Sequence, residues 1–273
     1  MTFRWDGGFI MVSWDHFDEG VDWYTTHFGW SCLDKVITPV GKKAFLKMPR
    51  LGVVTLKSFE SDFDHFKVRN NEEGYARLCF ETIDLEETLA YFEKEGIQVS
   101  EMGNLPTGQK SFDILAFENA RVTAVYNPSQ DGAFTGVRLT GFSDQICMRI
   151  GVTNLDRSIK WYQEHVGFSL VERGQQFAHM NVEDAYDWNE LKQKGYDSIL
   201  LEEIPLIEYK KSSPSVRTYF DVRPEYFSNT YEELQSKGME LSEIAGNPQT
   251  GWAGFHFYDP DGNQINVWSY PLR

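Results

Sequence analysis

The chain has 273 residues, 41% of them hydrophobic, and a formal net charge of −15. This acidic balance argues against nucleic acid and anionic membranes as partners, because both recruit clustered cations. The sequence has no run of about 18 apolar residues and no signal-peptide pattern, so we expect no membrane-spanning segment and a cytoplasmic protein. The three scattered cysteines, Cys32, Cys79 and Cys147, do not make a disulfide framework and fit a reducing compartment.

Four segments follow one plan, in which an alternating strand leads into a short amphipathic helix and then into further strands. The first segment has a strand at 9–14, a helix near 17–28 and strands at 43–48 and 53–58. The second has a strand at 77–82, a helix near 85–95 and strands at 111–117 and 121–126. The third has a strand at 147–152, a helix near 156–166 and a strand at 198–203. The fourth has a strand at 217–222, a helix near 225–237 and strands at 254–258 and 264–269. Each helix is followed by a glycine, which takes the left-handed conformation of a helix end most easily: Gly29, Gly96, Gly167 and Gly238.

An internal repeat relates the two halves of the chain. The helical sequences FDEGVDWYTTHFGW at 17–30 and LDRSIKWYQEHVGF at 155–168 share five identical positions without a gap. A second pair, 88–101 and 230–243, continues in both halves into a Thr-Gly step. The repeat divides the sequence into an N-terminal half, 1–128, and a C-terminal half, 140–273. The small and polar residues of 129–139 are typical of a linker.

The helix sequence NLDRSIKWYQEHVGF and the terminal hairpin FYDPDGNQINVW resemble the vicinal oxygen chelate superfamily, which includes glyoxalase I, bleomycin-resistance proteins and extradiol dioxygenases. The resemblance covers nearly the whole chain. It implies an α+β fold in which four βαβββ units form two cup-shaped mixed-sheet modules, one glyoxalase-like module from each half. It also implies that metal and substrate bind inside the cups.

The resemblance implies three metal-ligand positions in each module. In the C-terminal half these positions hold Cys147, Arg217 and Asn266, and in the N-terminal half they hold Phe9, Arg77 and Thr123. A cation needs deprotonated donors such as imidazole or carboxylate. Arginine supplies none, and asparagine is a weak neutral donor. We therefore expect no metal at these positions and no other cofactor.

Strand alternation predicts which side chains face into the C-terminal cup. The expected lining is Cys147, Arg149, Arg217, Tyr219, His256, Asn266 and Trp268. Two inward arginines indicate a carboxylate or phosphate on a small, partly apolar ligand, because a guanidinium holds such groups through two parallel hydrogen bonds. The alternative is an internal ion pair of either arginine with Asp221 or Glu202. His256 and Tyr219 are the candidates for proton transfer.

Three functions fit these observations. The leading interpretation is a metal-independent protein that binds a small anionic molecule in the C-terminal cup, as a monomer or homodimer. The second is an enzyme of the same superfamily, a lyase, isomerase or dioxygenase that uses a metal or acid–base chemistry. The third is a structural or regulatory protein whose cups are filled by their own side chains. The fold alone does not choose among them.

Overall fold

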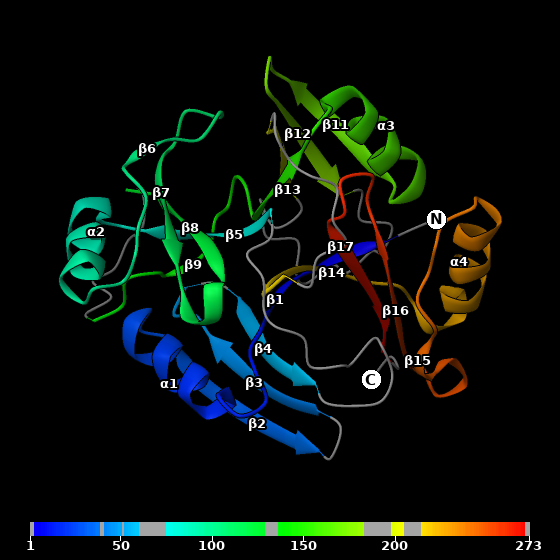
Figure 1. The fold of residues 1–273 in the computed structure, drawn as a ribbon, viewed down its shortest axis with the longest axis horizontal. Coiled ribbons are helices and arrows are strands. Elements are labelled where there is room, and N and C mark those ends of the chain that lie inside the picture. Colours follow the sequence, from blue (N-terminus) through cyan, green and yellow to red (C-terminus); the bar gives the residue numbers. More distant parts are fainter. Residues whose placement is uncertain are drawn as a thin grey trace.

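The structure, a computed structural model, describes residues 3–38, 41–50, 52–59, 75–128, 136–182, 198–204 and 214–270. These residues form four βαβββ units, as predicted (Figure 1). Unit 1 contains β1 (Arg4–Met11), α1 (Phe17–His27), β2 (Ser31–Thr38), β3 (Gly41–Lys47) and β4 (Val53–Phe59). Unit 2 contains β5 (Ala76–Thr82), α2 (Leu85–Lys94), β6 (Gly103–Asn104), β7 (Lys110–Leu115) and β8 (Arg121–Tyr126).

Unit 3 contains β10 (Met148–Val152), α3 (Leu155–His165), β11 (Phe168–Arg173), β12 (Phe177–Val182) and β13 (Ser198–Glu203). Unit 4 contains β14 (Val216–Asp221), α4 (Pro224–Ser236), β15 (Ala245–Asn247), β16 (Trp252–Tyr258) and β17 (Gln264–Ser269). A short strand, β9 (Gly141–Phe142), precedes unit 3. Of the predicted linker, 129–135 lies outside the described residues. No helix in the described ranges is both long and apolar enough to cross a bilayer.

Local sequence signals explain the helices, which begin and end within two residues of their predicted bounds. In α3 the Asn154 side chain accepts a hydrogen bond from the backbone N–H of Arg157 at 2.9 Å and caps the first turn. Ile159 and Tyr162 are buried on one face of this helix. The four glycines after the helices all have φ between 72° and 83°. The predicted role of these glycines is therefore confirmed.

The strands form two sheets, and each sheet combines units from both halves. Sheet A has the order β15-β16-β17-β14-β1-β4-β3-β2, and sheet B has the order β11-β12-β13-β10-β5-β8-β7-β6. The joints are antiparallel pairs between first strands, β1 with β14 and β5 with β10. Figure 1 shows the blue strands of unit 1 continuing into β14 and the red β17 of unit 4.

This pairing corrects the expectation that the two units of one half, 1–128 or 140–273, share a sheet. Unit 1 pairs with unit 4, and unit 2 pairs with unit 3. The repeat could not reveal this arrangement, because all four first strands carry similar alternating patterns. The residues of a first strand therefore do not specify which of the other first strands it pairs with.

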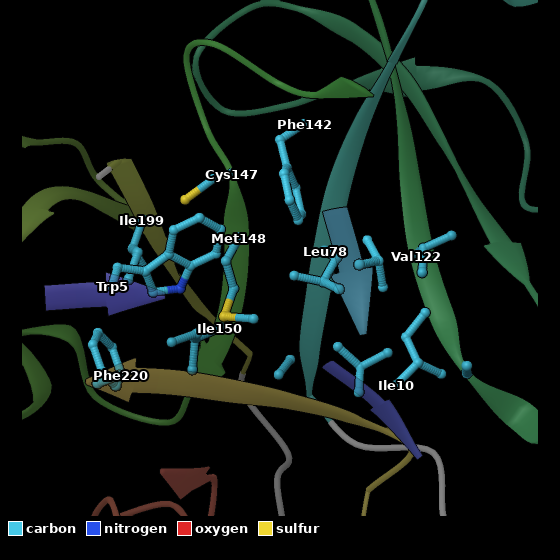
Figure 2. Close-up of a cluster of buried hydrophobic side chains, with 14 of the residues drawn as sticks. Trp5, Ile10, Leu78, Val122, Phe142, Cys147, Met148, Ile150, Ile199 and Phe220 are labelled. Carbon is cyan, nitrogen blue, oxygen red and sulfur yellow. The ribbon is translucent and has the colours of Figure 1, made fainter. Parts of the chain in front are cut away.

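One apolar core joins the two sheets and the four helices. Ile10 of β1 and Phe220 of β14 belong to sheet A, whereas Leu78 of β5 and Met148 of β10 belong to sheet B, and all four lie in this core (Figure 2). The sheets approach closely here, since a Cβ atom on Gly8 would lie 2.4 Å from a methyl carbon of Leu78. Each sheet therefore has two faces. One packs against the helices in this core, and we call the opposite one the inner face.

The terminal Asp-Pro-Asp-Gly turn holds unit 4 against α3 of unit 3. Asp259 is buried and accepts hydrogen bonds from the Tyr162 hydroxyl at 3.0 Å and from the Asn263 side chain at 2.8 Å. Asp261 forms an ion pair with Arg157. The motif therefore works as more than a turn between strands, because its two carboxylates connect the hairpin to a helix.

The N-terminal half has a turn with a similar closing hydrogen bond but without the first carboxylate. The N–H of Ala116 donates to Ala120 at 2.7 Å, as the N–H of Asp259 donates to Asn263 at 3.0 Å. Because alanine stands where the other half has Asp259, the buried hydroxyl of Tyr24, the repeat equivalent of Tyr162, has no hydrogen-bond partner among the described residues.

This difference predicts opposite effects for one substitution made in both halves. Tyr162→Phe removes a buried hydrogen bond to a carboxylate and should lower the free energy of unfolding by about 2 kcal/mol. Tyr24→Phe removes an unsatisfied hydroxyl and should leave stability unchanged or raise it by up to about 1 kcal/mol. Urea denaturation of both variants tests the pair, and equal losses would contradict the assigned hydrogen bonds.

Candidate functional site

The predicted lining residues of the C-terminal cup lie on two different sheets. Arg149 belongs to β10 in sheet B, whereas Arg217 and Tyr219 belong to β14 in sheet A. His256 on β16 and Asn266 and Trp268 on β17 also belong to sheet A. The expectation that Arg149 and Arg217 share one cup is therefore wrong. Its cause is the pairing of units across the halves.

Cys147 also departs from its predicted place. It precedes β10, and its side chain packs in the apolar core with Met148. Its Sγ donates a hydrogen bond to the Ser198 carbonyl at 2.9 Å. Regular alternation begins only at Met148, so the sequence pattern assigned Cys147 to the wrong face. We assign it a structural role.

An ion network on the inner face of sheet B engages Arg149. Its Nε donates to Glu202 at 2.6 Å, and its Nη1 donates to Asp113 at 2.9 Å and to the Thr123 hydroxyl at 3.0 Å. Arg77 donates to the second oxygen of Asp113 at 3.1 Å. Of the two alternatives for Arg149, the structure therefore selects the internal ion pair with Glu202.

Apolar side chains occupy the rest of this face. A small cluster combines Cys79, Leu105, Val125, Ile146 and Leu200, with Phe177 packed against it. Burial raises the pKa of the Cys79 thiol to about 12, so the thiol is neutral and unreactive at physiological pH. The inner face of sheet B is thus filled by its own side chains, as expected for a structural or regulatory protein, the third of the three functions considered.

The inner face of sheet A is different in character. We define it by Phe9, Met11, Lys43, Lys57, Arg217, Tyr219, Asn266 and Trp268. Phe9, Met11 and Tyr219 form a separate apolar cluster, against which Trp268 and Tyr270 pack. The rings of Phe9 and Tyr219 meet edge to face with centroids 5.2 Å apart. Register explains this gathering, because Phe9 lies opposite Arg217 in one strand pair and Tyr219 lies beside Asn266 in the next.

Two lysines lie on this aromatic surface. The Nζ of Lys57, a residue that is only 3% exposed, lies 4.2 Å from the ring centroid of Phe9 and 3.9 Å from that of Tyr219. Lys43 is the direct cross-strand neighbour of Lys57, and the Nζ atoms of both lie 5.7 Å from the centroid of Trp268. Such contacts stabilise a cation through the negative faces of the rings.

The remaining predicted residues have defined polar contacts. Arg217 donates from Nε to the Pro214 carbonyl at 2.9 Å. Asn266 donates to the Thr218 carbonyl at 3.1 Å and accepts from the Gln264 side chain at 3.2 Å. Asp221, one of the expected partners of the arginines, forms an ion pair with Arg4.

The two proton-transfer candidates lie on different strands of sheet A. His256 lies opposite Asn266 on β16, and Tyr219 lies on β14 beyond β17. The Tyr219 hydroxyl contacts that of Tyr270. His256 is half-buried, and its ring packs against Tyr258 with centroids 5.6 Å apart. Their use in catalysis remains a hypothesis.

The pairing of units across the halves divides the metal-ligand positions implied by the resemblance into two new sets, one on each sheet. Sheet A holds Phe9, Arg217 and Asn266, and sheet B holds Arg77 and Thr123, with Cys147 just before its strand. Neither set fits a metal ion, because a phenyl ring and a guanidinium offer no donor and the Asn266 amide is already hydrogen-bonded. Within the described ranges, no cluster of three His, Cys, Asp or Glu side chains is suited to a metal.

Sequence reasoning missed Lys43 and Lys57, and it assigned Phe9 to the N-terminal cup with Arg77 and Thr123 instead of to the face that carries Tyr219. These residues come from the N-terminal half, whereas the expected site was built from the C-terminal half alone. A usable signal was present: the alternation of β3 and β4 places Lys43 and Lys57 on the face opposite Ala44 and Leu56, which are buried. Only the pairing of β1 with β14 brings them to Tyr219.

Comparison with known proteins supports the architecture. No family model matches the sequence, and no curated protein matches it. Glyoxalase I from Zea mays has a similar structure, with a TM-score of 0.65 and 15% identity over 98% of this chain and 92% of that one. A "putative dioxygenase" from Bacillus subtilis has a TM-score of 0.63 and 11% identity over 98% of this chain and 86% of that one. The chain therefore shares its fold with these two structures, which agrees with the predicted arrangement of four βαβββ units in two mixed sheets.

Proposed function

We propose that the protein binds a small anionic, partly apolar molecule on the inner face of sheet A and does so without a metal ion. The observation that carries this proposal is the placement of Lys43 and Lys57 among Phe9, Tyr219 and Trp268. Cations on an aromatic surface suit a ligand that has one charged end and one apolar end.

The contrast between the two sheets supports this location. On sheet B, carboxylates of the same face neutralise Arg77 and Arg149. On sheet A, Lys43 forms no ion pair with a described residue, and Asp221 pairs with Arg4. A desolvated ammonium needs a counter-charge, and an anionic ligand would supply it. Arg217, which lies opposite Phe9, is a second group for the charged end of the ligand.

The donor set favours binding over the chemistry of a metal enzyme. The names of the similar structures include a glyoxalase and a dioxygenase, but identities of 11–15% carry the fold alone. Phe9, Arg217 and Asn266 do not offer a cation the donors that it needs. Location in the cytoplasm and a monomeric or dimeric state stay expectations from the sequence.

Thermal unfolding with a probe carboxylate tests the proposal. We expect 3-phenylpropionate to raise the melting temperature, because binding to the native state alone stabilises it. The uncharged 3-phenylpropionamide and the ringless propionate should each raise it less. Lys57→Met should remove most of the gain, since Met keeps the apolar length of the side chain and loses its charge.

Lys110→Met is the matched control, because Lys110 is an exposed lysine on β7 of sheet B. This variant should respond to 3-phenylpropionate like the wild type. An equal loss of response in both variants, or a gain of equal size with the amide, would contradict a specific anion site on sheet A.

A further inference from the structure

We propose that Lys43 is a nucleophilic amine that forms a Schiff base with an aldehyde or ketone bound on the inner face of sheet A. The inference rests on the proposed function, since it uses the same site. It names the substrate class: an anionic carbonyl compound such as a 2-oxo acid, whose carboxylate lies near Lys57 while its carbonyl carbon reaches Lys43.

The geometry around Lys43 carries this proposal. Lys43 lies directly opposite Lys57 on one side and opposite Val36 on the other. Directly opposite residues on antiparallel strands have Cβ atoms about 5 Å apart, so one small molecule can reach both amines. The Nζ of Lys43 lies 5.7 Å from the Trp268 centroid and makes no hydrogen bond or ion pair with a described residue. Lys43 is half-buried, so its amine is both sheltered and reachable.

The electrostatics of this position favour the neutral amine, which is the nucleophilic form. Burial lowers the pKa of Lys43. Amines that are desolvated or adjacent to another cation are the ones that proteins use for Schiff bases. No carboxylate of a described residue pairs with Lys43 to oppose this effect.

The reaction needs no group beyond the amine, the carbonyl and solvent. The neutral Lys43 amine attacks the carbonyl carbon and forms a C–N bond, and the carbonyl oxygen becomes a hydroxyl. Loss of that oxygen as water, with both hydrogens of the water derived from the amine, leaves a C=N bond. A proton from solvent then gives the iminium ion, which is an electron-withdrawing group for the bound compound.

Reductive trapping tests the proposal with phenylpyruvate and cyanoborohydride, which delivers a hydride to the iminium carbon and makes the bond permanent. Mass spectrometry of the intact protein should show one adduct, and peptide mapping should place it on Lys43. Burial lowers the pKa of Lys43 and so raises its share of neutral amine, and we therefore expect trapping at Lys43 to be several-fold faster than at the exposed Lys47.

Two variants and one probe separate the outcomes. Lys43→Arg keeps the charge and should lose the adduct, whereas Lys47→Arg should keep it. An adduct that persists in Lys43→Arg, or one spread over surface lysines, would overturn the proposal. If 3-phenylpropionate raises the melting temperature but phenylpyruvate is not trapped on Lys43, the Schiff base is refuted and the proposed function stands. If neither occurs, both fail.

Discussion

Replacing Glu81 by alanine should lower the free energy of unfolding by about 3–5 kcal/mol, because it removes a buried carboxylate to which three other residues donate. The Glu81 side chain is fully buried on β5 and forms an ion pair with Arg50 of unit 1. It also accepts hydrogen bonds from the Asn127 amide at 3.0 Å and from the backbone N–H of Asp144 at 2.8 Å. Alanine leaves all of these donors without this acceptor. Urea denaturation at neutral pH measures the loss.

Asp144→Asn is the control for this network. Asp144 also lies near Arg50, with 3.7 Å between Oδ2 and Nη2, but its side chain is 35% exposed. An exposed pair contributes less than about 1 kcal/mol, so this variant should unfold almost like the wild type. A loss below about 1 kcal/mol for Glu81→Ala would show that the carboxylate is not the connection between the units that the contacts indicate.

Arg149→Met should be the second large effect, with a loss of about 3 kcal/mol in the free energy of unfolding. The substitution removes the guanidinium that pairs with Glu202 at 2.6 Å and with Asp113 at 2.9 Å. Glu202 then keeps a partly buried charge without this counter-charge. The response to 3-phenylpropionate should remain that of the wild type, because Arg149 lies on sheet B.

The double variant Arg149→Met/Glu202→Leu distinguishes a broken ion pair from a packing defect. Replacing both partners with apolar residues of similar volume is often nearly neutral, so the double variant should recover most of the lost stability. A double variant as unstable as Arg149→Met would contradict the ion-pair explanation. Loss of the ligand response in Arg149→Met would contradict the location of the site on sheet A.

Patterns within each unit predicted the elements well, because they depend on neighbours in sequence. The alternation of Phe220 and Val267 with Tyr219 and Trp268 assigned both faces of β14 and β17 correctly. β2, β11 and β12 were not predicted, and neither were the short strands β6, β9 and β15. β2 and β11 are edge strands, where exposed apolar residues such as Leu33 and Val171 break the alternation that a half-buried strand shows.

The site was predicted only in part, because it depends on which strands become neighbours. Tyr219 and Trp268 were correctly placed on one face, but Lys57 reaches them only through the pairing of β1 with β14. Nothing in β14 alone distinguishes β1 from β10 as a partner. Arg149 was assigned to the same cup for this reason, although it lies opposite Arg77 on the other sheet.

The exchange of units between halves also bears on how the two sheets came to differ. Two copies of a half-chain, each lacking a partner for its first strands, would complete each other around a twofold axis through an isologous interface. In such a dimer both sheets would be identical, and any lysine suited to a ligand would appear in both. When the two copies are joined into one polypeptide, their sequences no longer have to be identical, and the two sheets can differ. Sheet B can then carry an internal ion network on its inner face, while the inner face of sheet A carries lysines and aromatic rings.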